Sequence, residues 1–138
     1  MPDVIVESLG NLRVLVSTGD HALVADEPKD VGDGLGPDPY ELLLGALGSC
    51  TTMTLLLYAR RKKWPLRNVK ANLAIERIHA RDCEDCEQKD GMIDRITVSL
   101  HLEGDLDDEQ RARLAEIATR CPVRKTLLGH PLIVDALD

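Results

Sequence analysis

Four cysteines are the residues of this 138-residue chain with the clearest capacity for chemistry. Cys50 and Cys121 stand alone in the sequence, whereas Cys83 and Cys86 form a CxxC pair. A cysteine thiolate is a nucleophile and a ligand for soft metal ions, and two thiols can close a disulfide. In a reducing compartment, cysteines at distinctive positions favour redox chemistry or metal binding over structural disulfides.

Cys121 directly precedes Pro122, a residue type that favours the first position of a helix. We therefore expect Cys121 to be the N-cap of a short helix that ends at Gly129. Free N–H groups and the positive dipole end favour a thiolate, the nucleophilic form of the side chain. Further positive charge comes from Arg120, Arg124 and Lys125. A cysteine that only caps a turn is an equally open interpretation.

Cys50 falls within a predicted helix that runs from Pro39 to about Lys62. Asp38 suits its N-cap, and Glu41 occupies the partner position of a capping box. Apolar residues occur on nearly all sides of this helix, which predicts a buried central helix. Cys50 is then either a small core residue or the floor of a pocket.

The segments before this helix predict an antiparallel meander of three strands. Residues 4–6, 12–16 and 21–25 are rich in β-branched and aliphatic residues, and turn signals separate them. A loop rich in Gly, Pro and Asp, residues 26–38, connects the meander to the helix. Long ordered loops of this kind are often functional.

The segments after the helix predict a hairpin, a second helix and a last strand. Residues 69–79 and 92–103 read as the two strands of the hairpin, and the second of them alternates apolar with polar side chains. The second helix begins at Asp107 and runs to about Arg120, and residues 131–137 are predicted as a strand. The expected fold class is α+β, with antiparallel sheets and a long buried helix.

The CxxC pair lies at the polar tip of the predicted hairpin, among acidic residues. This spacing is shared by zinc ligands and redox dithiols. Cys83, Cys86 and His79 could supply three metal ligands, and the acidic surroundings favour a cation. A reversible disulfide, unpaired structural thiols and direct catalysis are the other open interpretations of the pair.

Composition predicts a single globular domain over residues 1–138. Hydrophobic residues make up 43% and charged residues 30%, while the net charge is −7. The acidic balance argues against a nucleic-acid partner. The N-terminus lacks the basic and apolar regions of a signal peptide, and we find no apolar run near the roughly 20 residues of a membrane span. We therefore expect a cytoplasmic protein without a membrane partner.

Two segments taken together resemble one protein family. Residues 39–50 read PYELLLGALGSC, and residues 121–127 read CPVRKTL. In this order, and with the predicted order of elements, the sequence resembles the OsmC/Ohr family of osmotically induced protein C and organic hydroperoxide resistance proteins. The resemblance spans essentially the whole chain. It is to a less characterised OsmC-like branch, in which hairpin-tip cysteines also occur.

The resemblance implies a thiol peroxidase that needs no metal, flavin or other cofactor. Cys50 matches the peroxidatic cysteine, which reduces a small organic hydroperoxide and becomes a sulfenic acid. Cys121 matches the resolving cysteine, which closes a disulfide that an external dithiol then reduces. The resemblance also implies an intertwined homodimer with two active sites at the subunit interface.

The sequence departs from the family pattern at one position. The family's peroxidases have a Glu ten residues before the peroxidatic cysteine, paired with an Arg, but that position here is Tyr40. Glu41 and Arg13 are the candidates for the supporting pair, although helix capping already explains Glu41. Two other functions therefore stay open. One is a non-catalytic binding protein for a small apolar ligand or a metal, and the other is a redox sensor that oxidises without turnover.

Overall fold

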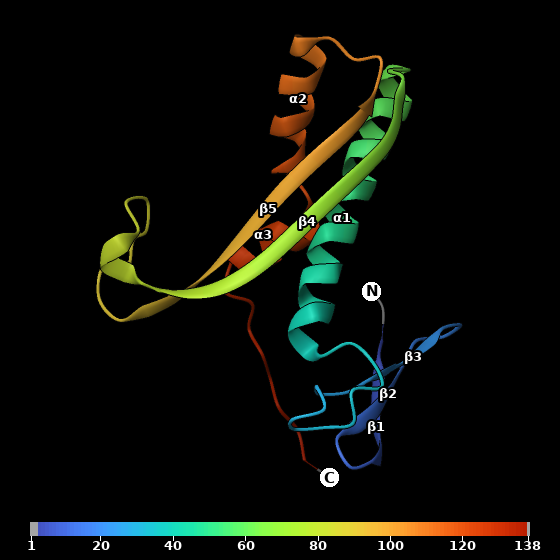
Figure 1. The fold of residues 1–138 in the computed structure, drawn as a ribbon, viewed down its shortest axis with the longest axis vertical. Coiled ribbons are helices and arrows are strands. Elements are labelled where there is room, and N and C mark those ends of the chain that lie inside the picture. The colour runs from blue at the N-terminus through green and yellow to red at the C-terminus, as the bar shows by residue number, and fades with distance from the viewer. Residues whose placement is uncertain (1–2, 138) are drawn as a thin grey trace. The chain divides into compact units, whose positions relative to one another are not determined.

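The computed structural model describes residues 3–137 of the chain. By its internal contacts the chain divides into two compact units, Met1–Gly45 and Ala46–Asp138. The first unit carries a three-stranded sheet, and the second carries a two-stranded sheet with helices (Figure 1). The predicted α+β class with antiparallel sheets and a long helix is confirmed.

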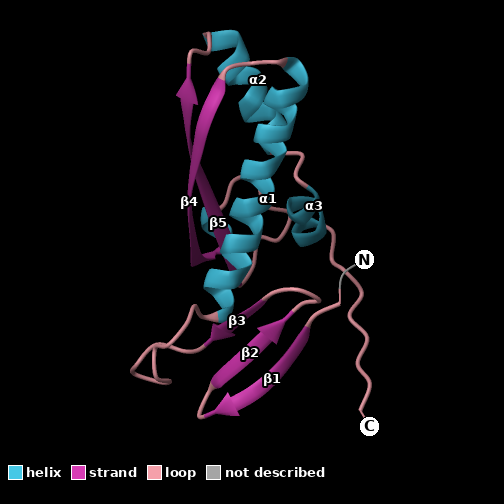
Figure 2. Ribbon diagram, turned by 90° about the vertical axis from the view of Figure 1, so that its right-hand side faces the viewer, coloured by secondary structure: helices cyan, strands magenta, loops and turns pink. Residues whose placement is uncertain are grey.

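The first unit is the predicted meander. Strands β1 (Ile5–Gly10), β2 (Arg13–Ser17) and β3 (Ala22–Ala25) pair antiparallel in sequence order. Figure 2 shows the three strands as one small sheet. Asn11 has a φ of 49°, the left-handed conformation that a tight turn between β1 and β2 requires.

Helix α1 (Pro39–Lys62) has the bounds that the sequence predicts. The backbone N–H of Glu41 donates to Asp38 Oδ1 at 2.8 Å, and the N–H of Asp38 donates to Glu41 Oε1 at 3.0 Å. These reciprocal bonds form the expected capping box and satisfy two backbone donors at the start of the helix. Pro39 occupies the first turn, where its missing N–H has no cost.

Burial of α1 within the chain is confined to one face. The buried positions include Leu47, Thr51 and Leu55, whereas Met53 is 60% exposed and Leu57 is 55% exposed. The apolar surface that the sequence places on all sides of the helix is therefore only partly covered by the chain's own elements. The remainder is available to a second molecule.

The hydropathy of α1 corrects one sequence expectation. An 18-residue window within the helix has a mean hydropathy of 1.6, so α1 is long and apolar enough to cross a membrane. The expectation that no apolar segment approaches that length is wrong on this measure. One such helix is weak evidence for a span, because the core helix of a soluble protein has the same length and composition.

The second unit is built around a long hairpin. Strands β4 (Leu66–His79) and β5 (Met92–Gly104) pair antiparallel, and the short helix η1 (Ala80–Asp82) begins the tip between them. Helices α2 (Asp108–Ala118) and α3 (Pro122–Leu128) follow. In Figure 2, α1, α2 and α3 lie on one side of this hairpin.

The core of the second unit joins both long helices to the hairpin. Leu55 and Tyr58 of α1 pack with Leu114, Ile117 and Ala118 of α2 in one buried cluster, which side chains of β4 and β5 cover. At Gly48 of α1, a Cβ atom would lie only 2.7 Å from a methyl carbon of Leu73 in β4. The helix thus approaches the sheet where it has no side chain.

The predicted strand over residues 131–137 is not formed, and this is a correction. These residues belong to no helix or strand, and their apolar side chains are exposed, with Leu132 at 89% and Val134 at 81%. A strand needs a neighbouring strand to satisfy its backbone N–H and C=O groups. Apolar and β-branched composition cannot reveal whether the chain supplies that neighbour.

We expect Leu114→Ala to lower the free energy of unfolding by about 3 kcal/mol, because it leaves a cavity in the shared core of α1 and α2. Leu114 is fully buried. Leu35→Ala removes the same atoms from a side chain that is 60% exposed and serves as the control, with an expected change below about 0.5 kcal/mol. Equal losses in urea unfolding would contradict the assigned core.

Candidate functional site

Cys121 is held at the start of α3. It is the N-cap of that helix, Pro122 occupies the first turn and Gly129 is the C-cap, all as predicted. The backbone N–H of Arg124 donates to Cys121 Sγ at 3.3 Å. The whole residue is buried, so this sulfur atom lies in a protein environment rather than in water.

Thr51 of α1 lies against the same sulfur atom. Its Oγ1 is 3.6 Å from Cys121 Sγ and 2.8 Å from the backbone oxygen of Leu47, one turn earlier in α1. The side chain is fully buried. The neighbouring residue, Cys50, is half-buried, and both Cys50 and Cys121 are free of disulfide bonds.

The surroundings of Cys121 favour its thiolate. Burial by itself raises the pKa of the thiol, because a charge is poorly solvated inside the protein. Hydrogen bonds from the Arg124 N–H, the Thr51 hydroxyl and the Cys50 thiol outweigh burial, and the positive charge of Arg124 adds to them. The net result is that the pKa of Cys121 lies below its ordinary value.

The geometry therefore brings together two free thiols from distant parts of the sequence. Cys50 directly precedes Thr51, whose hydroxyl lies 3.6 Å from Cys121 Sγ, and its thiol is among the groups that lower the pKa of Cys121. Cys50 is the more accessible of the two cysteines. Cys121 is buried and favours the anionic form. Two thiols that reach disulfide geometry can be oxidised to a disulfide.

Sequence reasoning missed Thr51. The available signal was a hydroxyl side chain next to Cys50 within a run of small and apolar helix residues. Polar residues on the buried side of a helix need a partner, and threonine often bonds to the carbonyl one turn earlier. That rule predicts the bond to Leu47, but the contact with Cys121 depends on the tertiary fold.

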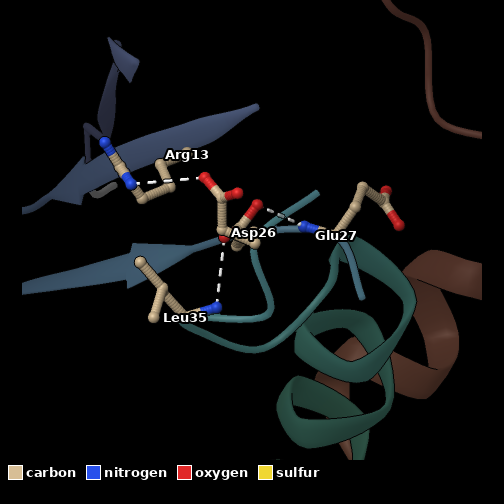
Figure 3. Close-up of polar contacts among 5 residues, drawn as sticks. Arg13, Asp26, Glu27 and Leu35 are labelled. Atoms are coloured by element: carbon tan, nitrogen blue, oxygen red, sulfur yellow. Dashed lines mark hydrogen bonds and ion pairs between the residues drawn. The ribbon is translucent and has the colours of Figure 1, made fainter. Parts of the chain in front are cut away.

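The two predicted supporting residues make their contacts within the first unit. Glu41 is the exposed partner in the capping box of α1. Arg13 Nη1 lies 3.3 Å from Asp33 Oδ2, an ion pair with the loop between β3 and α1 (Figure 3). A role for either side chain in activating Cys50 stays a prediction.

Asp26 organises that same loop and was also missed by sequence reasoning. It is a buried carboxylate whose two oxygen atoms accept hydrogen bonds from the N–H groups of Glu27, at 2.8 Å, and Leu35, at 3.1 Å (Figure 3). The bond to Leu35 joins residues nine positions apart in this long loop. It helps a segment rich in Gly, Pro and Asp to keep a fixed path into α1.

Cys83 and Cys86 form a disulfide at the hairpin tip. Lys89 Nζ donates to the backbone oxygens of Cys83 and Glu84, which holds the loop around the disulfide. His79 Nδ1 accepts from the N–H of Arg81. Within residues 3–137, no group of three His, Cys, Asp or Glu side chains is placed to hold a metal ion. The bonded sulfur atoms cannot act as thiolate ligands in this state.

The sequence of the chain matches the profile of a known protein family. The sequence profile described as OsmC-like protein matches residues 32–135. This range includes α1 with Cys50, the hairpin and α3 with Cys121. A search among curated proteins found no match.

Several solved structures share the fold at low sequence identity. An OsmC-like protein from Mycoplasma pneumoniae has a TM-score of 0.71 and 19% identity, over 94% of this chain and 89% of the other. An organic hydroperoxide resistance protein OsmC from Legionella pneumophila has a TM-score of 0.63 and 20% identity, covering 92% and 90%. The organic hydroperoxide resistance protein OhrB of Bacillus subtilis has a TM-score of 0.63 and 17% identity, covering 94% and 92%.

We expect the tip disulfide to contribute little to global stability. It links residues only three positions apart, so reduction releases few unfolded conformations. The double variant Cys83→Ser/Cys86→Ser should lose no more than about 2 kcal/mol of unfolding free energy. Limited proteolysis should meanwhile show faster cleavage at the tip than in the parent. A global loss of structure in circular dichroism would contradict this local role.

Proposed function

This chain belongs to the OsmC-like protein family, and from that premise we propose that it reduces organic hydroperoxides with Cys50 and Cys121. One observation carries the proposal: Thr51, the residue after Cys50 in α1, contacts the free thiol of Cys121 at the start of α3. The solved structures named as organic hydroperoxide resistance proteins support the substrate class. The small and apolar residues around Cys50 in α1 suit a substrate with an apolar group.

In the first step Cys50 attacks the hydroperoxide. Its proton passes to the Cys121 thiolate, whose pKa the Cys50 thiol helps to lower. The Cys50 thiolate then attacks the terminal peroxide oxygen, the O–O bond breaks and an alkoxide leaves. The alkoxide takes a proton from solvent to become the alcohol, and Cys50 becomes a sulfenic acid.

In the second step Cys121 resolves the sulfenic acid. Cys121 gives up the proton that it took from Cys50, and its thiolate attacks the sulfur of Cys50. The S–O bond breaks, and the departing hydroxide takes up that proton and leaves as water. An external dithiol reduces the resulting disulfide and becomes a disulfide itself. The sum is hydroperoxide plus dithiol giving alcohol, water and an oxidised dithiol. We propose the cytoplasm as the compartment, because dithiol reductants are kept reduced there.

We further propose that two copies of the chain form a homodimer through the uncovered apolar surface of the second unit. On α1, the exposed positions Ala46, Ser49, Met53, Leu56 and Leu57 recur at helical spacing. Such spacing makes one stripe on which another helix can pack. Residues 131–137 hold a second set of exposed apolar side chains and belong to no strand.

We expect Cys50→Ser to reduce dithiothreitol-dependent turnover of cumene hydroperoxide to the rate without protein, because the attacking sulfur is gone. Cys121→Ser should leave a Cys50 sulfenic acid that dimedone traps, visible as a mass increase. The double variant Cys83→Ser/Cys86→Ser is the control and should keep the parent rate.

Two outcomes of this experiment would contradict the peroxidase proposal. Parent-level turnover in Cys50→Ser would overturn the peroxidase proposal. A Cys50–Cys121 disulfide formed once by equimolar peroxide, without turnover on adding dithiol, would favour a redox sensor instead.

We expect the parent to sediment as a dimer at micromolar concentration and Leu57→Glu to sediment as a monomer, because a charge in the stripe would be buried without a partner. Val31→Glu, a charge placed on an exposed loop residue outside the stripe, should leave the dimer intact. A monomeric parent would contradict the proposed interface.

A further inference from the structure

The hydroxyl group of Thr51 has more hydrogen-bond acceptors near it than hydrogens to donate. Its hydroxyl lies within reach of two acceptors, the Leu47 carbonyl oxygen at 2.8 Å and Cys121 Sγ at 3.6 Å. A hydroxyl has one hydrogen, so it donates to one of them at a time. Thr51 is fully buried, so its hydroxyl is shielded from bulk water.

The two protonation states of Cys121 require two different arrangements of this hydrogen. When Cys121 is a thiol, its S–H can donate to Thr51 Oγ1 while the hydroxyl donates to Leu47. When Cys121 is a thiolate, its sulfur only accepts, so the hydroxyl must turn and donate to Sγ. The Leu47 carbonyl still accepts the helical bond from the Thr51 N–H, so the turn leaves no buried acceptor without a partner.

We propose that Thr51 is a positioning residue whose hydroxyl hydrogen switches from the Leu47 carbonyl to Cys121 Sγ when that sulfur is ionised. The switch makes a buried thiolate available without the entry of water. Its place in a catalytic cycle rests on the proposed peroxidase function, but the switch itself is a property of the reduced protein.

Thr51 is one of three groups that act on the sulfur atom of Cys121. The Arg124 N–H donates from the backbone of α3, and the Arg124 charge acts on the same sulfur. Cys50 is the other titratable group that bears on it, from α1. Cys50 loses its thiol hydrogen as soon as it reacts with a peroxide. Thr51 then remains as a side-chain donor at the moment when Cys121 must attack.

The test replaces the hydroxyl and follows the ionisation of Cys121. Thr51→Val keeps the shape but removes the donor, whereas Thr51→Ser keeps the donor and removes a methyl group. Both are made in a Cys50→Ala background, so that Cys121 is the free thiol that titrates. Thiolate absorbance against pH gives its pKa, and circular dichroism checks the fold.

We expect Thr51→Val to raise the pKa of Cys121 by about one, which leaves roughly tenfold fewer thiolates below the midpoint. Thr51→Ser should restore the parent value. A pKa unchanged in Thr51→Val, or equally raised in Thr51→Ser, would overturn the proposal. Either result would leave the peroxidase function untouched.

A second arm separates this proposal from the peroxidase function. With Cys50 present, Thr51→Val should slow disulfide formation after a peroxide pulse at neutral pH. The rate should recover as pH rises, because higher pH restores the thiolate. A raised pKa in a chain that turns over no hydroperoxide would support the hydrogen switch and reject the peroxidase. Hydroperoxide turnover by Thr51→Val with an unchanged pH profile would support the peroxidase function and reject the hydrogen switch.

Discussion

The site depends on one constraint, which is that a negatively charged sulfur inside the protein must receive hydrogen bonds. Removing an ion from water costs several kcal/mol unless fixed dipoles replace its hydration. Cys121 is fully buried, yet its pKa is lowered, because donors from two helices point at one atom. The backbone N–H of Arg124 and the hydroxyl of Thr51 do what water does for an exposed thiolate.

The core of the second unit holds those donors in place. Leu55 lies one turn after Thr51 in α1, and Ile117 and Ala118 lie just before Cys121. All three belong to the same buried cluster. Packing of α2 on α1 therefore fixes where α3 begins, since only a few residues connect α2 to α3.

Local signals in the sequence predicted most of the fold and one half of the site. The capping box that begins α1, at Asp38, depends on residues three positions apart, and so does the N-cap at Cys121. The contact between Thr51 and Cys121 joins residues 70 positions apart and could not be seen locally. The strand over residues 131–137 failed for the same reason, because pairing depends on what lies beside a segment.

The two cysteine pairs show how their surroundings decide what a sulfur atom does. Around Cys83 and Cys86 lie the exposed carboxylates of Asp82, Glu84 and Asp85, which would repel a thiolate. Closing a disulfide removes that repulsion, and the tip is closed. Around Cys121 lie donors and a guanidinium group, which stabilise a thiolate, and there the sulfur is free. The same residue type is thus directed toward a closed disulfide in one place and toward a reactive anion in the other.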